Sequence, residues 1–492
     1  MIVLGGVLAA ISGTGPALRA MRVPPVESLR GGPGASFGAL PRNPVWTGLG
    51  VGAFAAGALL ALAPPVGGFP FLGYAAGVLF MAGFGLLSPR LAGWMIPVIR
   101  RGAVRALPAE GRLAVQTIES SLGRVAVAVM SLAIAVAMLI SVAIMVASFR
   151  DTVTVWVDGT LEGDLYLRPG VPGGDGGRNR IDPAVLEALP GIPGVAALDR
   201  FRATGIDYRG FPAILASGEF ETIAAHSRLL FIGDHAIGEI AGRLIGADRV
   251  VVSEPFAVRH GLDEGDTILL PTPGGRVPFQ VEAVFYDYSS EGGMVVMDRS
   301  TWIERFRDTA VSNVAVYLEP DADPDRVRRA IAGAAPEAAV RIATNGELRG
   351  QVLRVFDQTF EVTYALEVIA LAVAMLGIAN TLAALILERR PELAMLRFIG
   401  ASRGQIRRIV VVEAGVVGVL GSAIGLALGL VLSVLLIYVI NFQSFGWTIQ
   451  FALPVGFVLQ SLALVLAATL AAGFYPASLA LRIDPIRAIR AE

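Results

Sequence analysis

Two long apolar runs of the chain are joined by the charged stretch Glu388-Arg389-Arg390-Pro391-Glu392-Leu393-Ala394-Met395-Leu396-Arg397-Phe398-Ile399-Gly400-Ala401-Ser402-Arg403-Gly404-Gln405-Ile406-Arg407-Arg408. Its apolar residues recur at helical spacing and predict a short amphipathic helix; they are Leu393, Leu396, Ile399 and Ile406. Gly400 and Ala401 supply a break, and Ser402 can cap a second helix that starts near Arg403. The stretch therefore predicts a short helix lying under a membrane, and on physics alone this helix can be an interfacial anchor.

The composition indicates a membrane protein. Hydrophobic residues make up 54% of the 492 residues and charged residues only 16%, whereas a soluble domain carries about 25% charged residues. The formal net charge of -1 provides no basic field, so we expect no nucleic-acid partner. Cysteine and lysine are both absent, which excludes disulfides, thiolate metal sites and the P-loop ending in Gly-Lys-Ser/Thr. We expect no catalytic residues, no cofactor and no metal, and no ATPase activity in this chain itself.

Runs free of Asp, Glu and Arg predict the membrane spans, because a bilayer core about 30 Å thick needs roughly 20 apolar helical residues. Four long runs occur: Val45 to Ser88, Val125 to Phe149, Val368 to Leu387 and Ala414 to Leu481. The turn composition Pro64-Pro65-Val66-Gly67-Gly68 divides the first run, and the segment around Asn441 divides the fourth. The chain is therefore expected to have six complete spans.

The arginines predict the orientation of these spans, because basic residues in short flanking loops stay on the cytoplasmic side. They fall into four clusters: Arg19 to Arg42, Arg90 to Arg124, Arg389 to Arg408 and Arg482 to Arg490. All four lie on one side if the spans alternate. We therefore expect both termini in the cytoplasm and the region from Arg150 to about Glu361 outside.

The outer region changes to short β-type runs, which predict an external α+β domain. The expected strands are Arg249 to Val252, Thr267 to Leu270, Val277 to Val284 and Asn313 to Leu318. A helix is expected from Asp323 to Ala334, with Asp323 as its cap and Pro324 at its first position. The Gly-rich segment Gly170 to Gly177 is expected to be a mobile loop.

Three features of this domain could suggest a site, and each has a simpler explanation. His226, His235 and His260 do not fit a zinc spacing, since the first two are nine residues apart. Gly261 to Thr267 holds three carboxylates but is read as a turn between strands. Tyr286 to Gly293 is expected to be an exposed loop, either a plain surface hairpin or a contact for a partner or substrate.

An internal repeat is the most specific signal in the chain. The segment Pro16 to Arg30 matches Pro476 to Arg490 with Pro, Ala, Ala, Arg, Pro and Arg in register, and an apolar run precedes each copy. A generic juxtamembrane arginine segment or a signal peptide are the competing interpretations, but no basic segment precedes the first apolar stretch. Duplication predicts that residues 1–13 are the remnant of the last helix of a first module.

The stretch Glu392-Leu393-Ala394-Met395-Leu396-Arg397-Phe398-Ile399-Gly400-Ala401-Ser402, followed by Gln405-Ile406, resembles the hallmark of the FtsX-like permeases, the MacB and lipoprotein-release class of ABC transporter membrane subunits. The Pro-Ala-x-x-Ala-x-Arg-x-x-Pro ending is similar to their terminal segment. The resemblance covers about Thr117 to Arg490. It implies a module of one helix, a large external domain and three further helices, here the C-terminal part of a double-module, ten-span permease.

The fold implied is a polytopic α-helical membrane protein with a large external α+β domain inserted between the first and second helices of an FtsX-like module. The expected segments, in chain order, are a first-module remnant (1–13), a cytoplasmic segment (14–44), a two-helix membrane linker (45–88), a cytoplasmic connector (89–116), the first helix (117–149), the external MacB-like domain (150–361), the second helix (362–387), the cytoplasmic coupling loop (388–408), the third helix (409–440), the fourth helix (452–480) and a cytoplasmic tail (481–492).

The resemblance also implies the function. The loop between the second and third module helices docks on a separate ABC ATPase, itself a dimer, and the positions carried over are Glu392, Leu393, Met395, Leu396, Arg397, Gly400, Ala401 and Ser402. Leu393, Met395 and Leu396 are the expected anchors. ATP hydrolysis would then move the external domain by mechanotransmission, for export, extraction or lipoprotein and lipid handling.

The same resemblance implies a location in the bacterial cytoplasmic membrane, in contact with the lipid bilayer. Possible further partners are a missing N-terminal module, a second permease copy or an external partner protein. A non-transport membrane regulator, in which the same lever activates an external hydrolase or a signalling partner, is the alternative function. The sequence does not separate the two functions.

Overall fold

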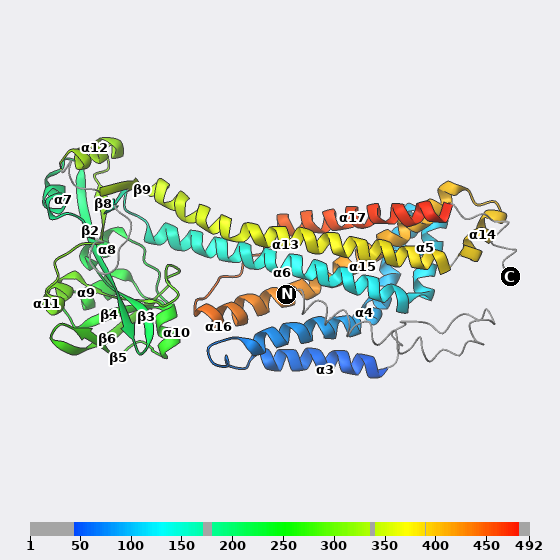
Figure 1. The fold of residues 1–492 in the computed structure, drawn as a ribbon, viewed down its shortest axis with the longest axis horizontal. Coiled ribbons are helices and arrows are strands. Elements are labelled where there is room, and N and C mark those ends of the chain that lie inside the picture. Colours follow the sequence, from blue (N-terminus) through cyan, green and yellow to red (C-terminus); the bar gives the residue numbers. More distant parts are fainter. Residues whose placement is uncertain (1–43, 171–179, 335–339, 389, 482–492) are drawn as a thin grey trace.

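The computed structural model describes residues 44–170, 180–334, 340–388 and 390–481. A helical bundle carries an α+β domain, the ectodomain, at one end (Figure 1). The expected segments at residues 1–13 and 14–43, the loop at 171–177 and the tail after residue 481 lie outside the described residues, so the repeat also remains a prediction.

The bundle contains long apolar helices, as the hydropathy predicts. Its helices are α3 (Pro44–Ala61), α4 (Phe71–Ala106), α5 (Pro108–Ser120), α6 (Leu122–Thr160), α13 (Asn345–Glu388), α14 (Arg390–Phe398), α15 (Arg403–Leu435), the π-helical segment Leu436–Asn441, α16 (Phe442–Phe445) and α17 (Val455–Leu481). Five described helices are long and apolar enough to cross a membrane: Pro44–Ala61, Phe71–Ala106, Val125–Thr160, Arg403–Phe445 and Val455–Phe474. The sixth expected span falls in α13, where several side chains are not described, so the count of six stays a prediction.

The large α+β ectodomain lies between α6 and α13, the first and second module helices, as expected. Helices α5 and α14, which carry arginines of the second and third clusters, lie at the opposite end of the bundle (Figure 1). The ectodomain therefore lies at one end of the bundle and arginine-bearing helices lie at the other, as the positive-inside pattern requires.

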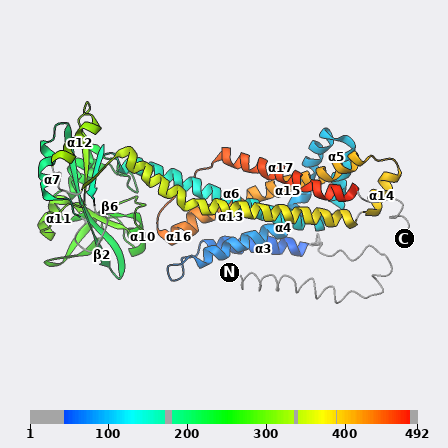
Figure 2. The ribbon, with the colours of Figure 1, turned by 45° about the horizontal axis from the view of Figure 1, so that its top comes forward.

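Helices α6 and α15 form the centre of the bundle, and Figure 2 shows them running side by side with α13 and α17. Their contact is close because Gly421, Gly425 and Gly429 recur every four residues on the side of α15 that faces α6. A Cβ added at Gly425 would lie 2.7 Å from the backbone oxygen of Ala133 on α6. Such stripes of small residues let membrane helices pack backbone against backbone.

Two membrane helices extend further than the expected bounds. We expected the first module helix to end at residue 149 and the second to start at 362, yet α6 continues to Thr160 and α13 begins at Asn345. The first charge marks where a helix leaves the lipid, but it does not end the helix. Val153 and Val157 of α6 pack there against Phe356 of α13, and this apolar contact keeps both helices intact outside the membrane.

The extended ends of α6 and α13 form a two-helix stalk under the ectodomain, held together along its length. Arg150 pairs with Asp357 at 3.3 Å, and Arg349 pairs with Asp158 at 2.8 Å.

The expected connector at residues 89–116 is also helical in the structure, since α4 runs on to Ala106 and α5 follows after a single residue.

In its described residues, the ectodomain is built on one nine-stranded sheet of order β5-β6-β4-β7-β3-β2-β8-β1-β9. The strands are β1 (Leu165–Pro169), β2 (Val195–Tyr208), β3 (Phe211–Gly218), β4 (Arg249–Ser253), β5 (Thr267–Thr272), β6 (Gly275–Phe285), β7 (Met294–Asp298), β8 (Asn313–Leu318) and β9 (Val340–Thr344). The helices are α7 (Pro183–Ala188), α8 (Phe220–His226), α9 (Ile237–Leu244), α10 (Glu254–His260), α11 (Arg299–Phe306) and α12 (Pro324–Ala334). All four expected strands are confirmed, and so is the cap of α12, since Asp323 accepts a hydrogen bond from Asp325 N at 3.0 Å.

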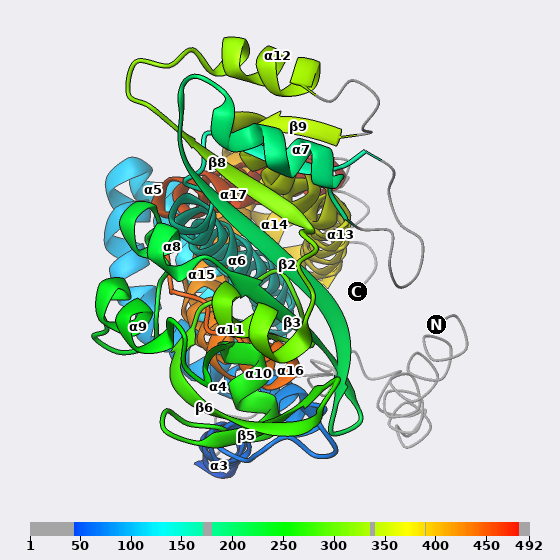
Figure 3. The ribbon, with the colours of Figure 1, turned by 90° about the vertical axis from the view of Figure 1, so that its left-hand side faces the viewer.

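The long strand β2 joins two halves of the ectodomain (Figure 3). Its first part pairs with β8 and its second part with β3. Separate apolar clusters fill the halves: Leu215, Phe256 and Phe279 belong to one, and Leu165 and Val314 to the other. A third cluster, which contains Phe220 and Val251, lies on the other face of the first half, and β2 contributes residues to all three clusters.

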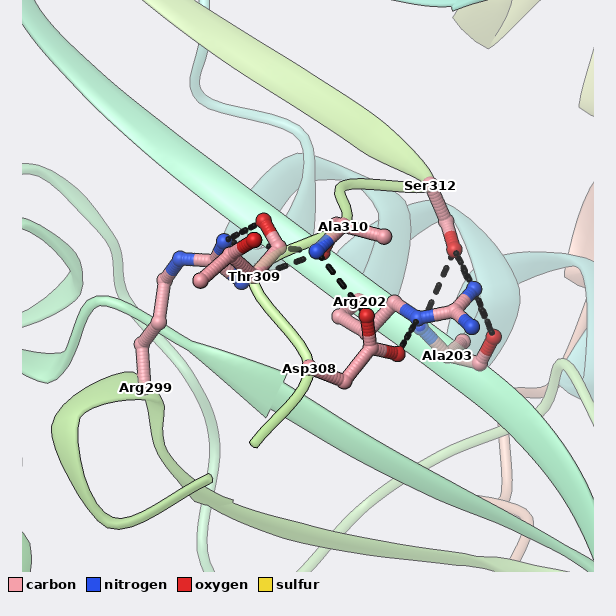
Figure 4. A network of polar contacts seen from close by, with 7 residues as sticks. All are labelled: Arg202, Ala203, Arg299, Asp308, Thr309, Ala310 and Ser312. Carbon is pink, nitrogen blue, oxygen red and sulfur yellow. Dashed lines mark hydrogen bonds and ion pairs between the residues drawn. The ribbon is translucent and has the colours of Figure 1, made fainter. Parts of the chain in front are cut away.

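A buried arginine network fixes the segment between α11 and β8 at the place where β2 changes partner (Figure 4). Arg202 of β2 donates from Nε to Asp308 at 2.8 Å and from Nη1 to Ser312 Oγ at 3.1 Å. Arg299 donates to the carbonyl oxygen of Thr309 at 2.8 Å. Because both guanidinium groups are buried and hydrogen-bonded, this network ties the two halves together.

The expected turn at Gly261 to Thr267 joins other elements than predicted. Residues Gly261 to Thr267 connect α10 to β5 rather than two strands. Gly261 ends α10 in the left-handed conformation, with φ of 61°, and Asp266 accepts a hydrogen bond from Asp263 N at 2.8 Å. The Asp266 carboxylate therefore stabilises the turn.

Candidate coupling sites at the two ends of the bundle

Helix α14 forms the first candidate site, at the end of the bundle opposite the ectodomain. Gly400 follows its last residues with φ of 101°, a conformation that favours glycine. Ala401 N donates to the carbonyl oxygen of Leu396 at 2.9 Å, and Gly400 N donates to that of Arg397 at 3.1 Å. This pair of hydrogen bonds is a Schellman motif, so Gly400 and Ala401 end α14 and turn the chain.

The predicted cap of the next helix is confirmed. Gln405 N donates to Ser402 Oγ at 3.2 Å, and Ser402 N donates to Gln405 Oε1 at 2.8 Å. This reciprocal capping box starts α15 at Arg403. Three of the carried-over positions, Gly400, Ala401 and Ser402, therefore fix the angle between α14 and α15.

The other carried-over residues of α14 differ in exposure. Leu393 is only 4% exposed, because it packs inside this chain, while Met395 is 66% exposed. Leu396 and Arg397 are half-buried, and the side chain of Glu392 lies outside the described residues. The structure does not present Leu393 as a free anchor, because its side chain is already buried.

The sequence interpretation missed two exposed side chains beside Met395. Phe398 is 78% exposed and Ile399 is 75% exposed. Together with Met395 they form an outward apolar surface, the α14 patch. The signal was present in the pair Phe398-Ile399 directly before Gly400, but a helix end leaves the direction of its last side chains undetermined by periodicity.

The second candidate site lies where the ectodomain meets the bundle. Glu254, at the start of α10, accepts hydrogen bonds from Thr448 N at 2.8 Å and from Thr448 Oγ1 at 2.6 Å. Tyr288 donates from its hydroxyl to the carbonyl oxygen of Thr448 at 2.7 Å. Two ectodomain residues thus hold all the polar groups of one residue in the segment between α16 and α17.

The same segment is bound to α6 by hydrogen bonds. Gln450 N donates to Thr152 Oγ1 at 3.0 Å, and Ala452 N donates to Ser148 Oγ at 2.9 Å. Ser148 and Thr152 are buried, one helical turn apart. The extended segment therefore connects α6, α17 and the ectodomain.

An apolar cavity of about 470 Å³ adjoins this junction. It is lined by Phe149 and Trp156 of α6, Phe356 of α13, and Tyr288 and Trp447. Trp447 stacks on Phe149 with ring centroids 6.0 Å apart. The lining comes from four separate segments, so its shape depends on how they are placed.

The expectation of an exposed loop at Tyr286 to Gly293 holds for Ser289 and Glu291 but is wrong for Asp287 and Tyr288. Asp287 is 3% exposed, and Tyr288 contacts the bundle instead of solvent. Burial raises the pKa of Asp287, and hydrogen bonds from Ser289 only partly oppose this shift. Burial likewise raises the pKa of Glu254, against the hydrogen bonds from Thr448. Polar residues in a loop suggested solvent, but Tyr288 packs against Phe149 and Trp156 of α6.

Each of the three histidines contacts another side chain of the ectodomain. His235 Nε2 lies 2.8 Å from Glu264 Oε1, His226 stacks on Tyr317, and His260 packs against Phe256. Within residues 44–170, 180–334, 340–388 and 390–481, no group of three or more His, Asp or Glu side chains is placed to hold a metal ion.

Comparison with known proteins identifies the two parts of the chain. The family model FtsX-like permease C-terminal matches residues 364–485, and the MacB-like periplasmic core domain matches residues 125–334. The first of these matches covers α14 and α15, and the second covers α6 and most of the ectodomain.

Curated relatives of this chain are also membrane proteins of ABC transporters by name. The uncharacterized ABC transporter permease protein Rv0987 of Mycobacterium tuberculosis is 30% identical over 418 residues, which are 83% of this chain and 48% of that protein. The lipoprotein-releasing system transmembrane protein LolC of Haemophilus influenzae is 24% identical over 50% of this chain and 65% of its own length. The macrolide export ATP-binding/permease protein MacB of Rhodopirellula baltica is 32% identical over 32% of this chain and 22% of its own length.

These matches and the fold define a polytopic membrane protein with a MacB-like periplasmic core domain between the first and second helices of its module. The chain carries an FtsX-like permease C-terminal region, and its relatives carry the names of ABC transporter permeases. It spans about half the length of the M. tuberculosis relative.

Proposed function

We propose that this chain is the membrane subunit of an ABC transporter and transmits the movement of a separate ATPase to the ectodomain. The α14 patch is the observation that carries this proposal. Met395, Phe398 and Ile399 expose apolar surface at the end of the bundle where the arginines lie, and a short helix with a few apolar anchors is a common way to bind a groove on a partner.

Direct contacts between neighbouring elements connect α14 to the ectodomain. The Schellman motif and the capping box join α14 to α15 at a fixed angle. Helix α15 packs along α6 through its glycine stripe, and α6 continues into the stalk. The Glu254 and Tyr288 contacts with Thr448 bind the far end of this path to the ectodomain. A push on α14 would therefore reach the ectodomain through rigid elements.

A dimeric ATPase offers two docking grooves, so the second would be filled by a second permease copy or by a preceding module of the same polypeptide. The ATP-dependent movement would act on cargo outside the membrane, in the location implied by the name of the MacB-like periplasmic core domain. Export, extraction, and lipoprotein or lipid handling all fit this arrangement.

The test is co-purification of the ATPase with variants of the α14 patch. The double variant Phe398→Ser/Ile399→Ser should lose the ABC ATPase and its vanadate-sensitive ATP hydrolysis, because the anchors are removed while Leu393 stays packed. Leu113→Ser is the matched control, since Leu113 is a 41% exposed apolar residue on α5 at the same end of the bundle. Arg403→Gln should also retain the ATPase, because an exposed charge contributes about 1 kcal/mol or less. Equal ATPase recovery with the double variant and the parent would refute the docking role.

A further inference from the structure

A cavity of about 600 Å³ lies between α4 and α5, at the end of the bundle opposite the ectodomain. Arginines dominate its lining: Arg100, Arg101 and Arg105 come from α4, and Arg112 comes from α5. Glu119 of α5 is the one carboxylate that lines it among the described residues. Its volume is that of a small-molecule site, which ranges over roughly 300–1,000 Å³.

The corner between α4 and α5 is built to hold these arginines in place. A Cβ added at Gly111 of α5 would lie 2.4 Å from the backbone oxygen of Ala103 on α4, so the two backbones touch. Helix α5 is amphipathic: Ala114, Val115 and Ile118 are buried toward the bundle, whereas Arg112, Gln116 and Glu119 are exposed toward the cavity. The cavity is therefore a feature of two packed helices, not of a loose loop.

The positive charge of the cavity is not compensated within the described part of the chain. None of its four arginines forms an ion pair with another described residue, whereas the neighbouring Arg408 of α15 reaches Glu110 of α5 at 3.7 Å. Four guanidinium groups around one carboxylate repel one another, and an anion would relieve this repulsion. Guanidinium groups match phosphate oxygens well, because they donate in a planar fork.

The position of the cavity along α4 indicates where this anion comes from. A helix that enters the bilayer at Phe71 has crossed the hydrocarbon after roughly 20 residues, near Leu91. Trp94 and Val98 follow and are 79% and 66% exposed, and an exposed tryptophan is typical of the headgroup level. Side chains of a helix lean toward its N-terminus, so the arginines after Val98 lean back toward the membrane.

We propose that this cavity binds the phosphate headgroup of an anionic phospholipid from the leaflet opposite the ectodomain. The occupant is a lipid because the arginines lie directly after lipid-exposed apolar residues of the same helix. Basic pockets between membrane helices are known to bind such headgroups. A bound headgroup would hold α5 against α4, and α5 in turn packs Val115 and Ile118 against Val416 and Val417 of α15.

The test measures lipid selectivity of the full-length chain in phosphatidylcholine bilayers. Spin-labelled phosphatidylglycerol and spin-labelled phosphatidylcholine are added in trace amounts, and the motionally restricted fraction of each label gives its relative affinity. The variants are Arg101→Gln/Arg105→Gln and Arg112→Gln. The matched control is Arg403→Gln/Arg407→Gln, which removes two exposed arginines of α15 at the same end of the bundle.

We expect the preference for phosphatidylglycerol to fall about fivefold for each cavity arginine removed, from α4 or from α5. The control should keep the preference, and millimolar inorganic phosphate should leave it unchanged. An equal loss in the control would overturn the proposal, because diffuse surface charge would then explain the selectivity. Displacement by inorganic phosphate would assign the site to a soluble anion instead. Unchanged selectivity together with loss of the ATPase would make the cavity a protein-docking surface.

Discussion

Replacing Gly425 with alanine tests how closely α6 and α15 pack against each other. A Cβ at this position would meet the backbone oxygen of Ala133 at 2.7 Å and Val136 Cβ at 2.7 Å. Ordinary contact begins near 3.4 Å, so the two helices must separate by roughly 0.7 Å, the difference between these distances. The neighbouring oxygen is part of the α6 backbone and cannot rotate away as a side chain would.

The expected cost follows from two opposing effects. Overpacking a tight contact costs about 1–3 kcal/mol, and alanine gains back up to about 1 kcal/mol over glycine inside a helix. Subtracting the full gain leaves a net destabilisation of about 0–2 kcal/mol. Gly421 and Gly429 would lose part of their own packing against Leu132 and Ile140 when the helices separate, which favours the upper part of this range.

The assay is titration of the detergent-solubilised chain with SDS, followed by tryptophan fluorescence, because Trp447 packs on Phe149 of α6. Gly52→Ala is the matched control, since a Cβ at Gly52 of α3 has no atom within 4 Å. The control should be neutral or slightly more stable than the parent. If Gly425→Ala unfolds at the same SDS fraction as Gly52→Ala, the contact is not as tight as described, and the α6 and α15 path loses its basis.

Two further predictions concern the ectodomain. Glu254→Gln places an amide where the carboxylate accepts hydrogen bonds from both Thr448 N and Thr448 Oγ1. The ATP-dependent movement of the ectodomain, measured by distance labels, should therefore decrease while ATPase binding persists, and Tyr288→Phe should act in the same direction. Unchanged movement in both variants would contradict the role of the junction. Burial raises the pKa of Asp199 to about 7, so the native state holds this proton more tightly than the unfolded state, whose aspartate titrates near pH 4; ectodomain stability should therefore fall as pH rises from about 4 to about 7 and level off above. In Asp199→Asn, the stability of the ectodomain should depend less on pH, as measured by hydrogen exchange with variant and parent compared at equal pH. Identical slopes of stability against pH in the two proteins would refute the prediction.

The sequence predicted the features that depend on local signals. The hairpin turn at Pro64 to Gly68, the break in the segment around Asn441, the cap at Ser402 and the cap at Asp323 each rest on a few adjacent residues with known backbone preferences. Four strands were likewise found from their β-type residues and the turn signals around them. These signals act within one or two turns of the chain, so a sequence carries them completely.

The features that the sequence did not reveal depend on contacts between distant segments. Glu254 and Thr448 are 194 residues apart, and neither stands in a recognisable pattern. Leu393 and Phe398 have similar hydrophobicity, yet one is buried and the other exposed, because the rest of the bundle decides which side of α14 is covered. The helical stalk was missed for the same reason: Phe356 and Val157 stabilise each other only in the folded protein.

The structure also indicates where a movement of α14 would be absorbed if the proposed function holds. Helix α15 is continuous from Arg403 to Leu435, about 50 Å of hydrogen-bonded backbone, and it cannot shorten without breaking those bonds. The next segment, Leu436–Asn441, is π-helical, and such segments are less stable than an α-helix and are common at functional sites. Asn441 lies at its end and donates to the carbonyl oxygen of Trp447 at 3.1 Å, directly before Thr448. A displacement of α15 therefore reaches the π-helical segment before it reaches α16 and Thr448, the residue that the ectodomain holds. At this segment the movement passes either to the ectodomain or into the helix itself.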